Sequence, residues 1–238
     1  MQTEELTYQA DGLAMRSELY VGEGSGRRPG VLVFPEAFGL SDHARSRAKR
    51  LAEMGYVALA SDLHGDAKLI QDLPQVMGII GPMIENPMST RARAKGAFDA
   101  LLARPEVDSK RVAAIGFCFG GTMSLELARA GEEIVAAVGF HSGLKTARPE
   151  DAKNIRGKVL VAIGADDPGI DLAQRNAFEN EMREGKVDWQ MHTYGGVVHS
   201  FTNKNADKLG RPDFARYSAE ADERSWASMR DLFSEVFA

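Results

Sequence analysis

The sequence is poor in cysteine and has no long apolar run, and both absences exclude classes of protein. Cys118 is the only cysteine among the 238 residues, so the chain can form neither an internal disulfide nor a zinc site built on several thiolates. The longest apolar stretches, such as residues 134–140, fall far short of the ~20 residues that a membrane-spanning helix needs. We therefore expect a protein of the reducing cytoplasm with no membrane partner.

Basic residues are also in the minority. The chain carries 29 Lys and Arg against 34 Asp and Glu, a net charge of −5. Because this balance lacks the positive field that dominates nucleic-acid binding, we expect no nucleic-acid partner. Glu4 and Glu5 stand where a secretory signal would carry positive charge, which also favours the cytoplasm. A monomer and a dimer are both compatible with the sequence.

The chain lacks any linker rich in proline or glycine, any charge run and any internal repeat. Its 44% apolar residues suffice for an ordinary core without covalent cross-links. We expect one domain over residues 1–238, with no separate lid domain.

Short apolar runs alternate with longer periodic segments along most of the chain. The short runs predict strands at residues 31–34, 56–60, 111–115, 134–140, 158–164 and 187–194. The periodic segments predict helices at residues 41–54, 89–103, 121–130, 171–184 and 219–237. Residues 13–21 predict an antiparallel edge strand beside the chain near Leu6. This order predicts an α/β fold with a mostly parallel sheet and helices on both faces, whose active groups gather at the carboxyl ends of the strands.

The segment Gly116-Phe117-Cys118-Phe119-Gly120 lies between a predicted strand and a predicted helix. It matches the sharp turn that exposes a nucleophile at a strand end, with cysteine where serine is commoner. The helix that begins there adds positive potential, which favours a thiolate. The alternative is that Cys118 is a small buried hydrophobic residue.

An acid and a histidine follow the cysteine in the order that such a fold requires. Asp167 follows the strand at residues 158–164, and His199 follows the strand at residues 187–194. A histidine can take the thiol proton while a carboxylate orients its ring. Asp166 is the rival for the acid role. The alternatives are a turn residue for Asp167 and a loop residue bonded to the backbone for His199.

The remaining histidines are weaker candidates. His43 and His192 are interpreted as surface residues, whereas His141 and His64 lie in strand-end loops that could line a pocket. Residues 62–66 alternate like metal ligands, but a metal site would need further ligands. We expect no metal and no organic cofactor.

Taken together, these motifs resemble those of the dienelactone hydrolase family of the α/β-hydrolase fold. The resemblance covers most of the chain and rests on residues 34–39, 61–65, 116–121, 164–168 and 199–201. It implies a cysteine-dependent hydrolase of lactones or esters, with Cys118, Asp167 and His199 as the catalytic triad.

The resemblance also implies two roles next to the first buried strand. Glu36 would hold the resting thiol protonated and swing away when substrate arrives. The backbone N–H groups of Ala37 and Phe119 would form the oxyanion hole. From the residues alone, Glu36 faces the same edge of the sheet as Cys118, and its alternative is a solvated loop acid.

The sequence departs from the family at the positions that bind the substrate carboxylate. Family members that hydrolyse dienelactone carry an arginine just after His-Ser-Phe, but here Thr202 and Asn203 precede Lys204. The family's other arginine lies after the second parallel strand, where residues 66–90 contain none and Arg91 is the nearest. The candidate substrate-binding residues are therefore Arg91, His141, Asn203 and Lys204. The apolar side chains of residues 77–84 suggest an acyl site or, alternatively, packing of that segment on the core.

The sequence predicts attack of Cys118 on a small lactone or ester and release of the acid through an acyl-enzyme. A general small-ester carboxylesterase is the alternative within enzymes. A non-catalytic or thiol-redox protein on the same fold is the alternative outside them.

Overall fold

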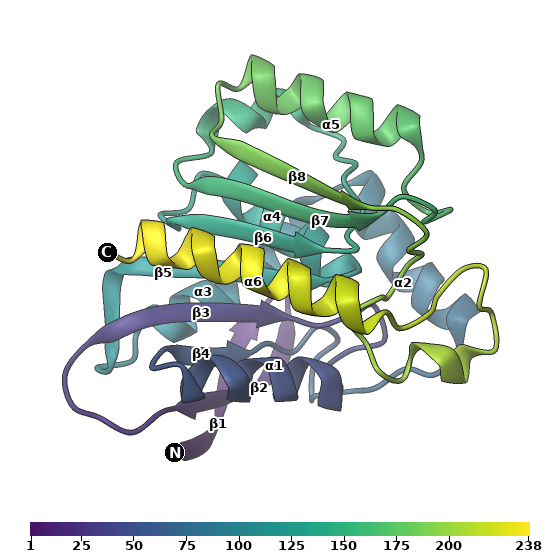
Figure 1. Ribbon diagram of the computed structural model, residues 1–238. Coiled ribbons are helices and arrows are strands. Elements are labelled where there is room, and N and C mark those ends of the chain that lie inside the picture. Colours follow the sequence, from purple (N-terminus) through teal and green to yellow (C-terminus); the bar gives the residue numbers. More distant parts are fainter.

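The computed structural model describes residues 1–238 and contains one eight-stranded sheet (Figure 1). The strand order is β1-β2-β4-β3-β5-β6-β7-β8. Strands β3 to β8 run parallel, while β1 pairs with β2 and β2 pairs with β4 in antiparallel register. The strands are β1 Gln2–Ala10, β2 Leu13–Val21, β3 Arg28–Phe34, β4 Val57–Ala60, β5 Val107–Phe117, β6 Ala136–Phe140, β7 Lys158–Gly164 and β8 Trp189–Tyr194.

Helices cover both faces of the sheet. Helices α1 and α6 pack on one face, and side chains of α2 to α5 join the core on the other (Figure 1). The helices are α1 Asp42–Glu53, α2 Leu73–Glu85, α3 Met88–Leu102, α4 Phe119–Arg129, α5 Leu172–Glu184 and α6 Ala219–Val236, with short 3₁₀ turns η1 Pro149–Asn154 and η2 Ala206–Leu209. None of these helices combines the length and apolar character needed to cross a bilayer.

The central strands show why helices cover both faces of the sheet. In β3, Leu32 and Phe34 join the core under α2 to α5, while Val31 and Val33 join the core under α1 and α6. Successive side chains of a strand point to opposite faces, so a strand without polar positions must be covered on both sides. The predicted α/β-hydrolase architecture, with a mostly parallel sheet and helices on both faces, is confirmed.

One helix was not predicted. Helix α2 begins after Asp72, whose side chain accepts a hydrogen bond from the N–H of Gln75 (2.9 Å), and it contains Pro82. Val76, Ile80 and Met83 lie on its buried side. The expected alternative of packing on the core therefore applies to Ile80 and Met83, whereas Met77 is exposed.

Candidate active site

Cys118 occupies the turn between β5 and α4. Its backbone has φ 54° and ψ −120°, a left-handed conformation that costs free energy for a residue with a side chain. Its N–H donates to the carbonyl of Phe140 (3.0 Å), which ties the turn to the end of β6. The cysteine side chain is partly exposed, unlike Phe117 and Phe119 on either side of it.

The two glycines of the turn are required by close contacts. A Cβ atom on Gly116 would lie 2.0 Å from the carbonyl oxygen of Gly120, and one on Gly120 would lie 2.3 Å from that of Phe34. Backbone atoms cannot yield to such contacts, so a side chain at either position would force the turn open. The same packing brings the cysteine turn against the end of β3, just before Glu36 and Ala37.

His199 and Asp167 meet at the ends of β8 and β7. His199 Nδ1 lies 2.7 Å from Asp167 Oδ2, and the other carboxylate oxygen accepts the N–H of Gly169 (2.8 Å). Asp167 is buried, whereas its rival Asp166 is exposed. The structure therefore gives Asp167 the position that orients the imidazole.

Burial of the imidazole alone would lower the pKa of His199. The charge of Cys118 and hydrogen bonds to Asp167 and Cys118 outweigh that effect and place the pKa of His199 well above its usual value. The ring thus lies between the carboxylate and the sulfur, and can exchange a proton with the sulfur. The structure brings together all three residues that the sequence singled out.

Strained backbone gathers at this edge of the sheet. Besides Cys118, His141 has φ 40° and Ser200 has φ 53°. His141 directly follows β6, and Ser200 directly follows His199. Left-handed conformations of residues with side chains persist where the surrounding structure fixes them, and they concentrate at functional sites.

The backbone N–H groups of Phe119 and Ala37, which the resemblance implied for the oxyanion hole, donate no hydrogen bond within the protein. Phe119 is the first residue of α4, so its N–H has no acceptor within the helix. The N–H of Ala37 donates to no backbone carbonyl. The carbonyl of Ala37 lies 2.8 Å from His64 Nε2, so the buried His64 ring holds this loop from behind. His64 thus holds this loop, and it also lines a separate cavity, as its strand-end position suggested.

Glu36 is buried and does not contact Cys118. Its carboxylate oxygens accept hydrogen bonds from Ser200 Oγ (3.0 Å) and Asn203 Nδ2 (2.6 Å). Burial would raise the pKa of Glu36, but its contacts with His43, His141 and Ser200 lower it to about 2. The resemblance implied a carboxylate bonded to the thiol, and this arrangement differs because two donors hold the carboxylate in another position.

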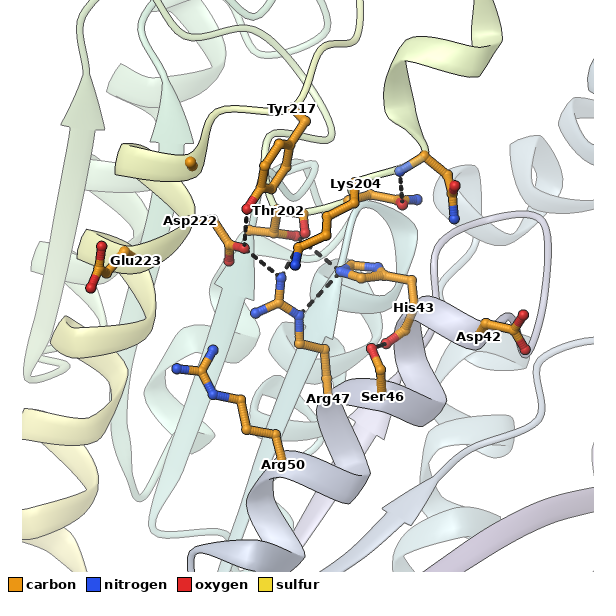
Figure 2. A pocket seen from close by; sticks show the side chains of 13 residues that line it. Asp42, His43, Ser46, Arg47, Arg50, Thr202, Lys204, Tyr217, Asp222 and Glu223 are labelled. Carbon is orange, nitrogen blue, oxygen red and sulfur yellow. Dashed lines mark hydrogen bonds and ion pairs between the residues drawn. The ribbon is translucent and has the colours of Figure 1, made fainter.

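His43 is buried, so its interpretation as a surface residue was wrong. Its Nδ1 lies 3.7 Å from Glu36 Oε2, and its Nε2 accepts from Arg47 Nε (3.3 Å). Arg47 also donates to the carbonyl of Thr202 (2.6 Å) and to Asp222 (2.8 Å) (Figure 2). Positions 43 and 47 are one helical turn apart, a signal of a shared face that the sequence contains but that names no partner.

His141 packs against His199 and is closed off from solvent. It is fully buried, its ring centroid is 5.2 Å from that of His199, and its Nε2 lies 2.8 Å from Thr202 Oγ1. Burial and the neighbouring His199 place the pKa of His141 well below its usual value. The His141 ring, whose lowered pKa favours the neutral form, packs against the His199 imidazole.

The predicted metal-like loop is structural. Asp62 accepts four backbone N–H groups, so both of its oxygens are already occupied. Those donors belong to Arg16, His64, Gly65 and Ala67. A carboxylate with this many backbone bonds fixes the loop after β4 and has no oxygen to spare for a cation.

Comparison with known proteins adds to this geometry. The sequence pattern of the "Dienelactone hydrolase family" matches residues 15–237, which is nearly the whole chain. The chain belongs to the dienelactone hydrolase family. It is thus a dienelactone hydrolase-like hydrolase.

Two solved structures are similar to this dienelactone hydrolase-like chain over its full length. A dienelactone hydrolase-like promiscuous phosphotriesterase from metagenomic libraries is 46% identical, with a TM-score of 0.94, covering 100% of this chain and 99% of that one. A structure named m3DLH is 48% identical, with a TM-score of 0.95 and the same coverage. A protein of Methylorubrum extorquens named "Putative carboxymethylenebutenolidase" is 27% identical over 94% of this chain and 78% of its own length.

The structure separates the candidate substrate-binding residues of this dienelactone hydrolase-like chain. Arg91 donates to Glu126 (2.8 Å) and Asp151 (2.7 Å), so its charge is engaged inside the protein and the prediction for it gains no support. Asn203 holds Glu36. Lys204 is exposed and extends toward Arg47 in a cavity that His43 also lines (Figure 2).

Proposed function

We propose that this protein hydrolyses small esters or lactones with Cys118 as nucleophile. The observation that carries the proposal is the position of the His199 ring, hydrogen-bonded to Asp167 and facing the sulfur of a strained turn. Most buried histidines have no such pair of partners. Membership of the dienelactone hydrolase family supports the same chemistry.

The reaction begins when His199 takes the proton of the Cys118 thiol and the sulfur attacks the acyl carbon. The C=O double bond becomes a C–O⁻ single bond, and this oxyanion lies against the N–H groups of Phe119 and Ala37. Collapse breaks the bond to the leaving oxygen, which takes the proton from His199. The product of this half is a thioester on Cys118.

Water completes the cycle. His199 removes a proton from water as it attacks the thioester carbon, and the carbon–sulfur bond then breaks. The thiol is restored and the acid leaves. For a lactone the leaving oxygen stays attached to the acyl group, so the single product is a ring-opened hydroxy or keto acid. An acyclic ester gives an acid and an alcohol by identical steps.

Glu36 has a separate proposed role, which the family resemblance supplies. To protonate or hold the thiol, its carboxylate would have to leave Ser200 and Asn203 and turn toward Cys118. If it does so in the free enzyme, Glu36→Gln speeds the labelling of Cys118 by iodoacetamide, whereas an unchanged rate contradicts the role. Intact mass after timed quenching measures that rate.

A second candidate activity is the hydrolysis of phosphotriesters. It is favoured by 46% identity, over the full length, to the structure described as a promiscuous phosphotriesterase. Attack at phosphorus would use the same sulfur and N–H groups. Turnover of a chromogenic phosphotriester that disappears in Cys118→Ala supports this activity, and its absence in the wild type contradicts it.

The hydrolase proposal is tested with chromogenic esters and a panel of lactones. Cys118→Ala should abolish turnover and His199→Ala should remove most of it. His192→Ala is the matched control, because His192 lies partly exposed on β8 and contacts only Ser228 Oγ (3.0 Å). Wild-type rates in both site variants would overturn the proposal and favour a non-catalytic or thiol-redox protein.

A further inference from the structure

A cavity of about 310 Å³ opens beside the proposed catalytic centre. Its lining includes the polar side chains of Glu36, Ser200 and Asn203 and the apolar side chains of Phe38, Leu69 and Leu209. Cavities of this size are large enough for a small organic group. The reaction steps proposed above place no substrate group in this cavity.

The position of the cavity ties it to the reacting atoms. Glu36 and Phe38 are the neighbours of Ala37, whose N–H is one oxyanion donor, and Ser200 directly follows His199. These chain neighbours place the cavity next to the loops of the site, so a substrate bound at Cys118 can extend one of its two arms toward it. What lines the cavity then decides which arm fits.

The cavity carries negative charge. Both oxygens of Glu36 accept hydrogen bonds from neutral donors, as those of an ionised carboxylate do. His43 Nδ1 lies farther away, 3.7 Å from Glu36 Oε2, and the other ring nitrogen accepts a hydrogen bond from Arg47. Asp42 adds a second carboxylate, which is exposed and lies 3.9 Å from Arg45 Nη1 outside the cavity lining.

No lysine or arginine lines the cavity. Three lysines are chain neighbours of lining residues, but Lys68 lies 3.9 Å from Asp66 and lines another cavity, and Lys204 lines the one in Figure 2. Lys208 precedes Leu209 and is exposed outside the cavity. A substrate carboxylate placed here would meet two carboxylates and no lysine or arginine in the lining.

We propose that this cavity receives an uncharged, largely apolar arm of the substrate and excludes an arm that carries a carboxylate. The inference rests on the proposed ester or lactone hydrolase and names its substrate class. It assigns to the cavity a selection that follows from the carboxylates of Glu36 and Asp42, the lack of a lysine or arginine in the lining, and the apolar side chains there.

The test compares two acyl esters that differ in charge alone at the far end. We use mono-p-nitrophenyl glutarate, which is anionic at pH 7, and p-nitrophenyl methyl glutarate, in which that carboxylate is a methyl ester. At low ionic strength the uncharged ester should have at least ~10-fold higher kcat/KM than the anionic one. Added salt should reduce this ratio, because it screens the repulsion. Equal values, or preference for the anion, overturn the selection.

A positive charge introduced at position 69 tests whether the acyl arm binds in this cavity. Leu69 is 53% exposed, so a long polar side chain can replace it without disturbing the core. Leu69→Lys should raise kcat/KM for the anionic ester about 3- to 10-fold relative to the uncharged one, whereas Leu69→Gln, which removes the same apolar contact, should leave the ratio unchanged. An unchanged ratio in Leu69→Lys shows that the cavity does not hold the acyl arm and overturns the proposal.

The hydrolase assignment and the charge selection can fail separately. If the wild type turns over neither ester, the hydrolase assignment is wrong. If it turns over both with equal kcat/KM and Cys118→Ala turns over neither, the hydrolase assignment stands and the charge selection is wrong.

Discussion

At the scale of single residues, Asp167 and Asp166 offer a matched pair. They are adjacent in the chain, but Asp167 bonds to His199 Nδ1 and Asp166 faces solvent. Asp167→Asn should lower kcat by roughly 10³–10⁴-fold, since an amide favours the wrong imidazole tautomer. Asp166→Asn should retain most of the activity. Steady-state kinetics with one ester measures kcat for both variants. Similar losses of kcat in the two would contradict the assignment of Asp167 as the residue that orients His199.

The protonation of His199 gives a second prediction at this scale. Burial lowers the pKa of His199, and Cys118 is the largest influence that raises it. Cys118→Ala should therefore lower the pKa of His199, as followed by NMR titration of its ring. In the wild type the raised pKa stabilises the fold fully below pH ~6.5 and less as pH rises through the folded-state pKa. That alkaline loss of stability should shrink in Cys118→Ala; an unchanged pKa would show that sulfur and ring do not interact.

The individual site residues were predictable to different degrees. Cys118, Asp167 and His199 each follow a strand and carry chemistry that few other residues can supply, so their order along the chain sufficed to predict that they lie together. His43 was missed because its environment comes from Glu36 and Thr202, which lie far away in sequence. The partners of Arg91, Glu126 and Asp151, could not be recognised from the sequence for the same reason.

At the scale of secondary-structure elements, the turn between β5 and α4 gives a stability prediction. Gly120→Ala should lower the free energy of unfolding by at least about 1–3 kcal/mol, because the new Cβ would meet the Phe34 carbonyl oxygen at 2.3 Å. The loss of catalytic activity should exceed what the lower stability alone would cause, because the nucleophile moves with the turn. Chemical denaturation and ester kinetics measure the two effects.

Gly195→Ala is the control for that variant. No atom lies within 4 Å of a Cβ at Gly195, and its backbone needs no left-handed conformation. Its unfolding free energy should stay within about 0.5 kcal/mol of the wild type. Equal effects at the two glycines would show that the close packing of the turn does not constrain it.

Most elements could be predicted because the spacing of their apolar residues matches the helix or strand that forms there. The strand predicted at residues 158–164 coincides with β7, and the strand predicted at residues 13–21 coincides with β2. The edge position predicted for residues 13–21 was wrong, because β2 pairs with β1 on one side and β4 on the other. Helix α2 could not be predicted: Gly78, Gly81 and Pro82 lower its intrinsic helix propensity. It forms because burial of Val76, Ile80 and Met83 against the rest of the chain outweighs that weakness.

At the scale of the whole molecule, a buried ion network joins helices that are distant in sequence. Arg129 is fully buried and bonds to Glu126 on its own helix and to Glu181 on α5 (2.7 Å). Arg129→Met should cost about 3–5 kcal/mol of unfolding free energy, because it leaves Glu181 buried without a counter-ion. Urea unfolding measures the loss.

The exposed pair of Arg156 and Glu133 is the control for the network. Its two side chains are 59% and 78% exposed, so water screens the attraction between them. Arg156→Met should change the unfolding free energy by less than ~1 kcal/mol. A comparable loss in the two arginine variants would mean that burial does not set the strength of these pairs.

The central claim is that a covalent acyl group forms on the sulfur of Cys118. We would mix the protein with an activated ester, quench within milliseconds and locate added mass by peptide mass spectrometry. The account predicts one acyl group on the peptide containing Cys118, formed in step with a burst of released alcohol and absent in Cys118→Ala. Turnover of the ester with no adduct at any time, or with the adduct on another residue, would contradict it.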